Sequence, residues 1–421
     1  MNLPDLIHQI GRQARVASRS LATLPTDTKN AILHAMADEL VARTDLVIAE
    51  NAQDVANAEA AELTRASIDR LRLDPDRVAA IAAGIRQVAT LPDPVNETMR
   101  AWTRQNGLQI SKVRKPIGVI GIIYESRPNV TSDAAVLCMK TGNATILRGG
   151  RESLRSNLAI ADALQTGGAR AGLPDHAIQL IPVVDREAVQ LLCQMDDCID
   201  VIVPRGGHGL IEAVVTHARM PVIKHYDGVC HVYVDEMADL AMAERIVINS
   251  KTQRPGVCNA LETLLLHEAI AEKFLTQAGP ALSAADVELR AEGETYAQLK
   301  TLNYELLGTA ENYTTEYLDL ILAVKIVASL DTAIDHVNLH GSHHSDAIIT
   351  TDAANAERFL NEVDSATIYH NASTRFTDGE EFGFGAEIGI STDKLHARGP
   401  MALEELTTYR YLIRGTGQIK P

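Results

Sequence analysis

The sequence is poor in aromatic residues. Phe, Trp and Tyr make up 4% of its 421 residues, and Trp102 is the single tryptophan. Proteins that bind single-stranded nucleic acid commonly stack bases on aromatic side chains. The formal net charge of −16 at pH 7 would also repel a phosphate backbone. We therefore expect no nucleic-acid partner, although a local basic patch could bind a small anion.

Long apolar runs and export signals are also missing. No stretch approaches the ~20 apolar residues that a membrane helix needs, and residues 1–5 contain neither a basic segment nor an apolar one. The five cysteines, an odd number, are scattered along the chain and do not make a disulfide framework. We expect a cytoplasmic protein with free thiols and no association with a membrane.

The spacings typical of zinc sites are absent. His225, Cys230, His231, His343 and His344 are residues of the types that bind zinc. No C-x-x-C or H-E-x-x-H spacing connects them, and fourteen histidines make chance neighbours unsurprising. We therefore assign no metal ligand and keep zinc as an alternative only.

What the sequence does contain is an alternation of strands and helices from residue 117 onward. The run 117–124 is almost continuously apolar, as expected of a strand covered on both faces. Further strands are expected at 144–147, 178–181, 199–203 and 221–224, with helices between them. This alternation predicts a doubly wound parallel sheet, and a second α/β unit begins at 231. The first hundred residues show helical periodicity, and the basic segment 104–116 suits an edge hairpin, an oligomer arm or a solvated linker.

Such sheets bind ligands at the carboxyl ends of their strands. There Gly206 and Gly207 would let backbone amides approach a pyrophosphate at a helix N-terminus, but the strict G-x-G-x-x-G spacing is absent and a plain tight turn is an alternative. Arg148 and Arg151 follow the second strand where an acidic residue would select NAD. Basic groups there suit the 2′-phosphate of NADP, unless they lie on a solvated loop.

Two residues are candidates for catalysis. Cys258 follows Pro255 and Gly256, a pair expected to form a tight turn that places the thiol at the start of a strand. A nucleophilic thiolate needs a rigid, partly open position of this kind, whereas a small buried hydrophobe is the alternative. Asn129 follows the first strand of the parallel sheet. Its amide could stabilise an oxyanion or cap the next helix.

Together these features resemble the aldehyde dehydrogenase superfamily, and most closely its branch that reduces a γ-glutamyl acyl phosphate. The segments that carry the resemblance are 115–120 (KPIGVI), 126–131 (SRPNVT), 203–207 (VPRGG), 224–228 (KHYDG), 253–260 (QRPGVCNA), 383–391 (GFGAEIGIS) and 396–401 (HARGPM). The resemblance implies an α/β fold with a Rossmann-like cofactor domain, an α/β catalytic domain and a small oligomerisation element. The expected ranges are 1–103 and 117–228 for the first, 229–395 for the second, and 104–116 with 396–421 for the third.

The same resemblance implies an activity. It is the NADPH-dependent reduction of L-glutamyl 5-phosphate to L-glutamate 5-semialdehyde, with release of phosphate, through a thioacyl intermediate on a cysteine in proline biosynthesis. A small-molecule substrate, a homo-oligomer and handover from glutamate 5-kinase are the implied partners.

The resemblance also implies site residues, some within the matched segments and others at positions where the superfamily contacts its ligands. Cys258 is expected to be the nucleophile and Asn129 the oxyanion donor. The expected cofactor contacts are Arg148, Arg151, Gly206, Gly207, Ser126 and Glu316, and the expected substrate contacts are Arg375, Ser373, Thr374 and Arg127.

One departure from the superfamily pattern bears on the chemistry. Hydrolytic members carry a general-base Glu in an E-L-G-G stretch, whereas residues 225–229 here read HYDGV. A water-activating base is needed to hydrolyse a thioester but not when phosphate enters or leaves. The alternatives that stay open are a hydrolytic dehydrogenase with Asp227 as base, a zinc-dependent enzyme like histidinol dehydrogenase, and a non-catalytic scaffold.

Overall fold

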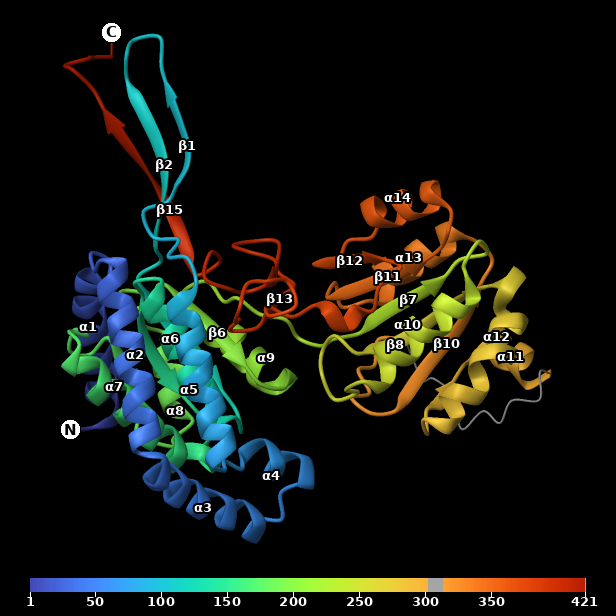
Figure 1. The fold of residues 1–421 in the computed structure, drawn as a ribbon, viewed down its shortest axis with the longest axis horizontal. Helices are drawn as coiled ribbons and strands as arrows, with labels where there is room; N and C mark the ends of the chain where they lie inside the picture. The colour runs from blue at the N-terminus through green and yellow to red at the C-terminus, as the bar shows by residue number, and fades with distance from the viewer. Residues whose placement is uncertain (302–312, 421) are drawn as a thin grey trace. The chain divides into compact units, whose positions relative to one another are not determined.

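The computed structural model describes residues 1–301 and 313–420, which divide into two compact units (Figure 1). Unit 1 comprises Met1–Lys224, Gly383–Gly389 and Met401–Pro421, and unit 2 comprises His225–Phe382 and Ile390–Pro400. The cofactor and catalytic roles expected for these parts of the chain remain predictions. No helix in the described ranges is long and apolar enough to cross a membrane.

Unit 1 is built on a four-stranded parallel sheet. Its strands are β3 (Val119–Tyr124), β4 (Ala144–Arg148), β5 (Ile178–Leu180) and β6 (Val201–Arg205), in the order β5-β4-β3-β6. Every residue of β3 and β4 is buried, which explains their almost continuous apolar sequence. The predicted doubly wound parallel sheet is confirmed.

Helices cover both faces of this sheet (Figure 1). On one face lie α6 (Pro128–Lys140) and α7 (Leu154–Arg170), and on the other lie α1 (Leu3–Leu21) and α8 (Glu187–Cys193). The remaining helices of this unit are α2 (Thr26–Ala42), α3 (Thr44–Ala60), α4 (Arg65–Leu71), α5 (Pro75–Thr90), η1 (Arg151–Ser153) and α9 (His208–His217). α2 and α5 form an outer layer on α6 and α7, so the predicted helical scaffold is confirmed.

The strand expected at 221–224 is reduced to a single bridge between Val222 and Ile202. Pro221 has no amide hydrogen to donate to a neighbouring strand. Its carbonyl accepts from the Ile202 amide at 3.0 Å, and the Ile223 amide donates to the Ile202 carbonyl at 2.9 Å. The pairing then stops, so this expected strand was wrong.

The basic segment 104–116 forms a hairpin and not a linker. β1 (Thr98–Thr103) pairs with β2 (Gln109–Pro116), and β2 pairs with β15 (Thr407–Arg414) along its whole length, both antiparallel. This three-stranded sheet extends away from the helices of unit 1 (Figure 1). Most of β1 and β15 is exposed to solvent.

Unit 2 contains a six-stranded parallel sheet in the order β12-β11-β7-β8-β10-β9. Its strands are β7 (Cys230–Val234), β8 (Leu261–His267), β9 (Glu288–Arg290), β10 (Ile321–Val327), β11 (Ser345–Ile349) and β12 (Thr367–His370). The helices are α10 (Leu240–Thr252), α11 (Glu268–Ala284), α12 (Gly293–Thr301), α13 (Leu330–His340) and α14 (Ala353–Glu362). Shorter elements are η2 (Thr374–Phe376), β13 (Ile390–Ser391) and β14 (Gly399–Pro400).

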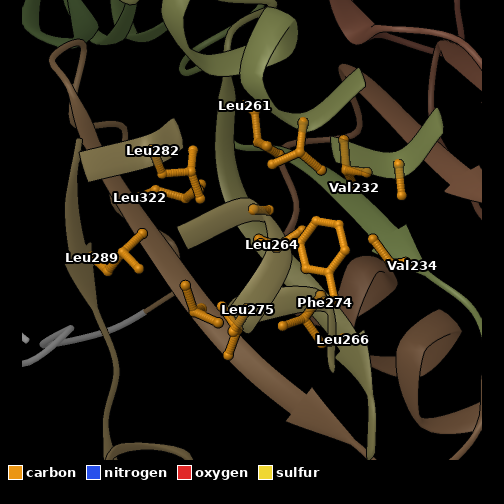
Figure 2. Packing of buried hydrophobic residues seen from close by; sticks show 14 of the residues in the cluster. Val232, Val234, Leu261, Leu264, Leu266, Phe274, Leu275, Leu282, Leu289 and Leu322 are labelled. Atoms are coloured by element: carbon orange, nitrogen blue, oxygen red, sulfur yellow. The ribbon is translucent and has the colours of Figure 1, made fainter. Parts of the chain in front are cut away.

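The two faces of the unit 2 sheet have separate cores. Val232, Leu264 and Phe274 belong to a cluster with side chains from α10 and α11, shown in Figure 2. Tyr233 and Leu265, the next residues along the same strands, pack with α13 and α14 on the other face. Because successive side chains of a strand point to opposite faces, strands covered on both sides are apolar at most positions, and the buried Glu262 of β8 is an exception that needs a partner.

Candidate active site

Cys258 differs from the other cysteines in its exposure. All five cysteines, each within the described residues, are free, and four of them are buried while Cys258 is half-buried. Burial raises the pKa of the Cys138 thiol to about 12 and that of Cys193 to about 11. Such thiols are inert at neutral pH. Cys258 alone combines a free thiol with access to solvent.

A turn between α10 and β8 positions Cys258, as the sequence predicted. Gly256 does not adopt a positive φ, so its conformational freedom, which we expected to matter, is not what shapes the turn. The glycine that matters is Gly228. A Cβ added there would lie 1.9 Å from the carbonyl oxygen of Cys258, so only glycine allows the two backbones to pack this closely.

A buried ion pair joins the two ends of this turn. Nζ of Lys251, near the end of α10, lies 2.9 Å from Oε2 of Glu262, near the start of β8, and neither side chain is exposed. Burial lowers the pKa of the Lys251 ammonium and raises the pKa of the Glu262 carboxyl, and each partner opposes the other's shift. The other Glu262 oxygen accepts from the Leu318 amide at 3.3 Å. The pair therefore fixes the base of the Cys258 turn.

The segment 373–377 packs against the same turn. Nδ2 of Asn259 donates to the Thr377 carbonyl at 2.9 Å, and Thr374 Oγ1 donates to the Asn259 carbonyl at 2.8 Å. Ser373 Oγ lies 2.9 Å from Ser250 Oγ. The hydroxyls of Ser373 and Thr374 are thus buried and engaged within the protein, so their predicted substrate contact stays a prediction.

Arg375 is half-buried, and its carbonyl accepts from Nδ2 of Asn259, the residue after Cys258, at 3.4 Å. Burial lowers the pKa of its guanidinium, and the electrostatic effect of Cys258 opposes this change. Its Nε donates to Gln253 Oε1 at 2.9 Å. The segment that carries Arg375 therefore packs on the turn that carries Cys258, and the predicted contact of Arg375 with substrate stays a prediction.

Glu316, an expected cofactor contact, also lies at this turn. Its Oε1 accepts from the Gly228 amide at 2.9 Å, next to the close packing of Gly228 on Cys258. Burial raises the pKa of the Glu316 carboxyl, and the hydrogen bond from Gly228 opposes this shift.

Two histidines near the thiol were not assigned a role from the sequence. One ring nitrogen each of His225 and His344 and the Sγ of Cys258 all lie within 4.8 Å of one another. In the sequence, both histidines belong to a set of possible zinc ligands, but no known ligand spacing connects them to Cys258. Only the parallel pairing of β7, β8 and β11 brings the loops that precede these strands together.

In unit 1, a cavity of about 650 Å³ opens at the carboxyl ends of the strands. Its volume is within the usual range for a small-molecule site. Polar and small residues that line it include Ser126, Arg148, Arg151, Glu152, Arg186 and Gly209. The loops after β3 and β4 predicted to meet a cofactor therefore line one cavity.

Three arginines contribute to this cavity. Arg148 is 9% exposed and donates to the carbonyls of Gly149 and Val184, both at 3.0 Å. Its Nε has no partner among the described residues. Arg151 is exposed, and Arg186 lines the cavity from the loop that leads to α8. Arg186 was not predicted from the sequence to contact the cofactor. The parallel pairing of β5 with β4 brings the loop that carries Arg186 to the cavity.

A carboxylate lies at the glycine turn that precedes α9. Glu125 Oε2 accepts from the Gly207 amide at 2.9 Å, and a Cβ added to Gly206 would lie 2.5 Å from the same oxygen. A Cβ on Gly206 would therefore displace the Glu125 side chain, whereas a Cβ on Gly207 would meet no atom within 4 Å. The anionic group that this turn contacts is the Glu125 carboxylate, and the predicted contact with a pyrophosphate stays a prediction.

Ser126 and Glu152 are joined within the same cavity. Glu152 Oε1 accepts from the Ser126 amide at 2.8 Å and from its hydroxyl at 2.6 Å. Ser126 has a φ of +38°, which is unusual for a residue other than glycine. The two hydrogen bonds from Ser126 to Glu152 hold this backbone in place.

Asn129 lies in the first turn of α6 and does not cap it. Arg127 occupies the cap position, and Pro128 is the first helical residue, a position that suits proline. Asn129 Nδ2 donates to Asp133 Oδ2 at 2.8 Å. Burial raises the pKa of Asp133 to about 6, although the Asn129 hydrogen bond opposes this shift. The capping alternative was wrong, and the amide of Asn129 is oriented by Asp133.

Comparison with known proteins agrees with this architecture. Residues 4–296 match the model of the aldehyde dehydrogenase family. Gamma-glutamyl phosphate reductases from Clostridium kluyveri and Moorella thermoacetica are 53% and 54% identical over 420 residues, covering all of this chain and all of each relative.

A solved structure gives the same result. The crystal structure of gamma-glutamyl phosphate reductase from Thermotoga maritima superposes with a TM-score of 0.95 at 40% identity, and the alignment covers 99% of this chain and 100% of that one. The expected family and fold class are both confirmed. The chain belongs to the aldehyde dehydrogenase family and, within it, to the gamma-glutamyl phosphate reductases.

Proposed function

We propose that this chain reduces L-glutamyl 5-phosphate to L-glutamate 5-semialdehyde with NADPH and releases inorganic phosphate, as a step of proline biosynthesis. The observation that carries the proposal is Cys258, the one half-buried thiol among five, held on a turn by Gly228 and the Lys251–Glu262 pair. Full-length relatives named gamma-glutamyl phosphate reductase support the choice of substrate.

Cys258 is the nucleophile in this proposal. Its thiolate attacks the γ-acyl carbon, a carbon–sulfur bond forms, and the carbon–oxygen bond to phosphate breaks. Phosphate leaves as an anion, so no water-activating base is needed.

The oxyanion that forms at the acyl carbon needs hydrogen-bond donors. We assign these to the backbone N–H of Cys258 and to the side-chain amide of Asn129. Because one Asn129 proton is donated to Asp133, the amide has a fixed orientation and a second proton that remains for the oxyanion. When the later hemithioacetal oxyanion collapses, the aldehyde forms and Cys258 leaves as the thiolate.

The residues at the unit 1 cavity fit a phosphorylated dinucleotide. Gly206 permits close backbone approach, and α9 begins directly after Gly207, so its positive N-terminus faces a bound anion. Arg148, Arg151 and Arg186 suit the 2′-phosphate that distinguishes NADPH from NADH. When bound, NADPH supplies the hydride that reduces the thioacyl group. Glu316 is assigned to the nicotinamide ribose.

The amino acid part of the substrate needs ionic partners. Arg375 is assigned to its carboxylate, with Arg127 as an alternative ligand for carboxylate or phosphate. Ser373 and Thr374 are assigned supporting contacts. Because their hydroxyls already bond to Ser250 and Asn259, their contribution is to hold Arg375 in position.

The assembly is part of the proposal. The three-stranded sheet of β1, β2 and β15 exposes Tyr409, Tyr411 and Ile413 to solvent, and exposed apolar residues of this kind suit an interface. We assign this sheet to contacts in a homo-oligomer. Handover of the labile acyl phosphate from glutamate 5-kinase stays a prediction to which we assign no residue.

Substitution of the nucleophile tests the proposal. Cys258→Ser is expected to abolish turnover of glutamate 5-semialdehyde with NADP, while the affinity for NADPH, measured by fluorescence titration, stays at the wild-type value. Turnover retained by Cys258→Ser would overturn the proposed function. The matched control is Cys138→Ser, because Cys138 is buried within α6 and has no part in the chemistry.

A further inference from the structure

Three side chains of unit 2 converge, and two of them have no role in the proposed reduction of an acyl phosphate. They are His225, Cys258 and His344, and one ligand atom of each lies within 4.8 Å of the other two. They precede β7, β8 and β11, which are neighbouring strands. Imidazole nitrogens and a thiolate are the ligands that zinc prefers.

His344 provides the independent observation. It is completely buried, and its Nε2 has no hydrogen-bond partner among the described residues. Its Nδ1 lies 2.8 Å from Ser345 Oγ. An unpartnered buried nitrogen lowers stability, and a bound cation would supply the missing partner.

His225 has the complementary arrangement. Its Nδ1 lies 2.8 Å from the carbonyl oxygen of Ile390. Because a carbonyl can only accept, Nδ1 must carry the proton, and Nε2 then presents a lone pair. Histidines that bind metals usually donate their other N–H to a carbonyl or a carboxylate in this way.

We propose that His225, Cys258 and His344 form a binding site for a zinc-class divalent cation, which blocks the nucleophile reversibly. The cation binds Nε2 of each histidine and Sγ of Cys258, and the thiol proton passes to solvent. Three protein ligands leave a fourth position open to water, as in other zinc sites. The blocking effect rests on the proposed role of Cys258, whereas the binding itself does not.

The geometry and charge of the site suit such an ion. Zinc bonds of about 2.0–2.3 Å place ligand atoms within about 4 Å of one another, so small side-chain movements complete the site. Burial of His344 disfavours a positive charge there, and the carboxylates of Asp346 and Glu316 offset part of this effect. Arg375 adds a positive charge that acts on Cys258, so we expect weaker binding than at a structural zinc site.

A cobalt titration of the full chain tests the site without substrate or cofactor. Co²⁺ replaces Zn²⁺ in such sites, and a cobalt–thiolate bond adds a charge-transfer absorption in the near ultraviolet. We expect one equivalent to bind with this absorption and Cys258→Ala to lose it. The expected affinity of His225→Gln and of His344→Gln is lower by at least about 100-fold. His34→Ala, on the exposed side of α2, serves as the matched control and binds like the wild type.

Several outcomes would overturn the site. They are binding without the charge-transfer band, a band retained by Cys258→Ala, wild-type affinity in both histidine variants, or the absence of binding. Blocking of the nucleophile is measured separately, in an assay of turnover. Zinc is expected to abolish turnover, and a chelator is expected to restore it. The titration can fail while Cys258→Ser still lacks turnover, so the failure of this site and the failure of the proposed function are distinguishable.

Discussion

The two parallel sheets of this protein place their polar residues at opposite ends of their strands. In unit 1, Ser126 follows β3, Arg148 is the last residue of β4, and Arg186 follows β5, so all three lie at carboxyl ends. In unit 2, Cys258 and His344 precede β8 and β11 at the amino ends. The rule that doubly wound sheets bind ligands at their carboxyl ends therefore describes the first sheet but not the Cys258 region of the second.

The difference has an electrostatic consequence. In unit 1, α6 and α9 begin just after β3 and β6, and the N-terminus of a helix attracts anions such as phosphate. In unit 2, α10 and α13 end shortly before Cys258 and His344, and a helix C-terminus repels anions. Positive charge that acts on Cys258 must therefore come from side chains such as Arg375.

The largest expected effect concerns the Lys251–Glu262 pair. Lys251→Met leaves the buried Glu262 carboxylate unpaired and should lower the free energy of unfolding by about 3–5 kcal/mol in a denaturant titration. The double variant Lys251→Met/Glu262→Met should recover most of this stability, because it leaves no unpaired charge. An unchanged stability in the single variant would contradict the view that this pair fixes the Cys258 turn.

The second effect concerns the oxyanion. Asn129→Ala removes the assigned donor and should reduce kcat by about 10²–10³ with little change in the affinity for NADPH, as measured by steady-state kinetics and cofactor titration. Asp133→Asn tests how Asn129 is oriented and should have a smaller effect in the same direction. If Asn129→Ala raised only KM, the assigned role would be wrong.

The third effect concerns cofactor choice. Arg186→Ala removes a charge from the cavity and should weaken NADPH binding by about 10-fold or more, while NADH binding changes little. Arg19→Ala, which removes an exposed charge from α1, is the control. Equal losses for both cofactors would place Arg186 away from the 2′-phosphate.

The smallest effect concerns Glu125, whose carboxylate accepts from the amide that a pyrophosphate would use. Glu125→Gln keeps the shape but removes the charge, so NADPH should bind about two- to fivefold more tightly in a fluorescence titration. Weaker binding would instead mean that Glu125 supports the cofactor directly.

Much of the fold could be predicted from the sequence because buried parallel strands are apolar at most positions. Residues 117–124 and 144–147 show this, and β3 and β4 are completely buried. The expected strand at 221–224 was wrong because Pro221 cannot donate to a neighbour and the pairing ends after one bridge.

The candidate site was harder to predict because it depends on contacts between distant segments. The signal at Cys258 was local, since Pro255 and the apolar strand behind it adjoin the thiol. The role of Gly228 was not visible in sequence, because it depends on close approach to the Cys258 backbone. His225, His344 and Arg186 likewise reach their sites only through the strand order. The glycine turn at 206–207 could be recognised in the sequence, but the sequence did not indicate that the Glu125 carboxylate would contact its amide.

The most direct test of the account is the reduction of NADP with glutamate 5-semialdehyde, followed by absorbance with and without inorganic phosphate. The account predicts reduction that requires phosphate, because phosphate must displace the acyl group from Cys258, and no reduction by Cys258→Ala. Reduction at the same rate without phosphate would contradict it, because water would then release the acyl group as in a hydrolytic dehydrogenase.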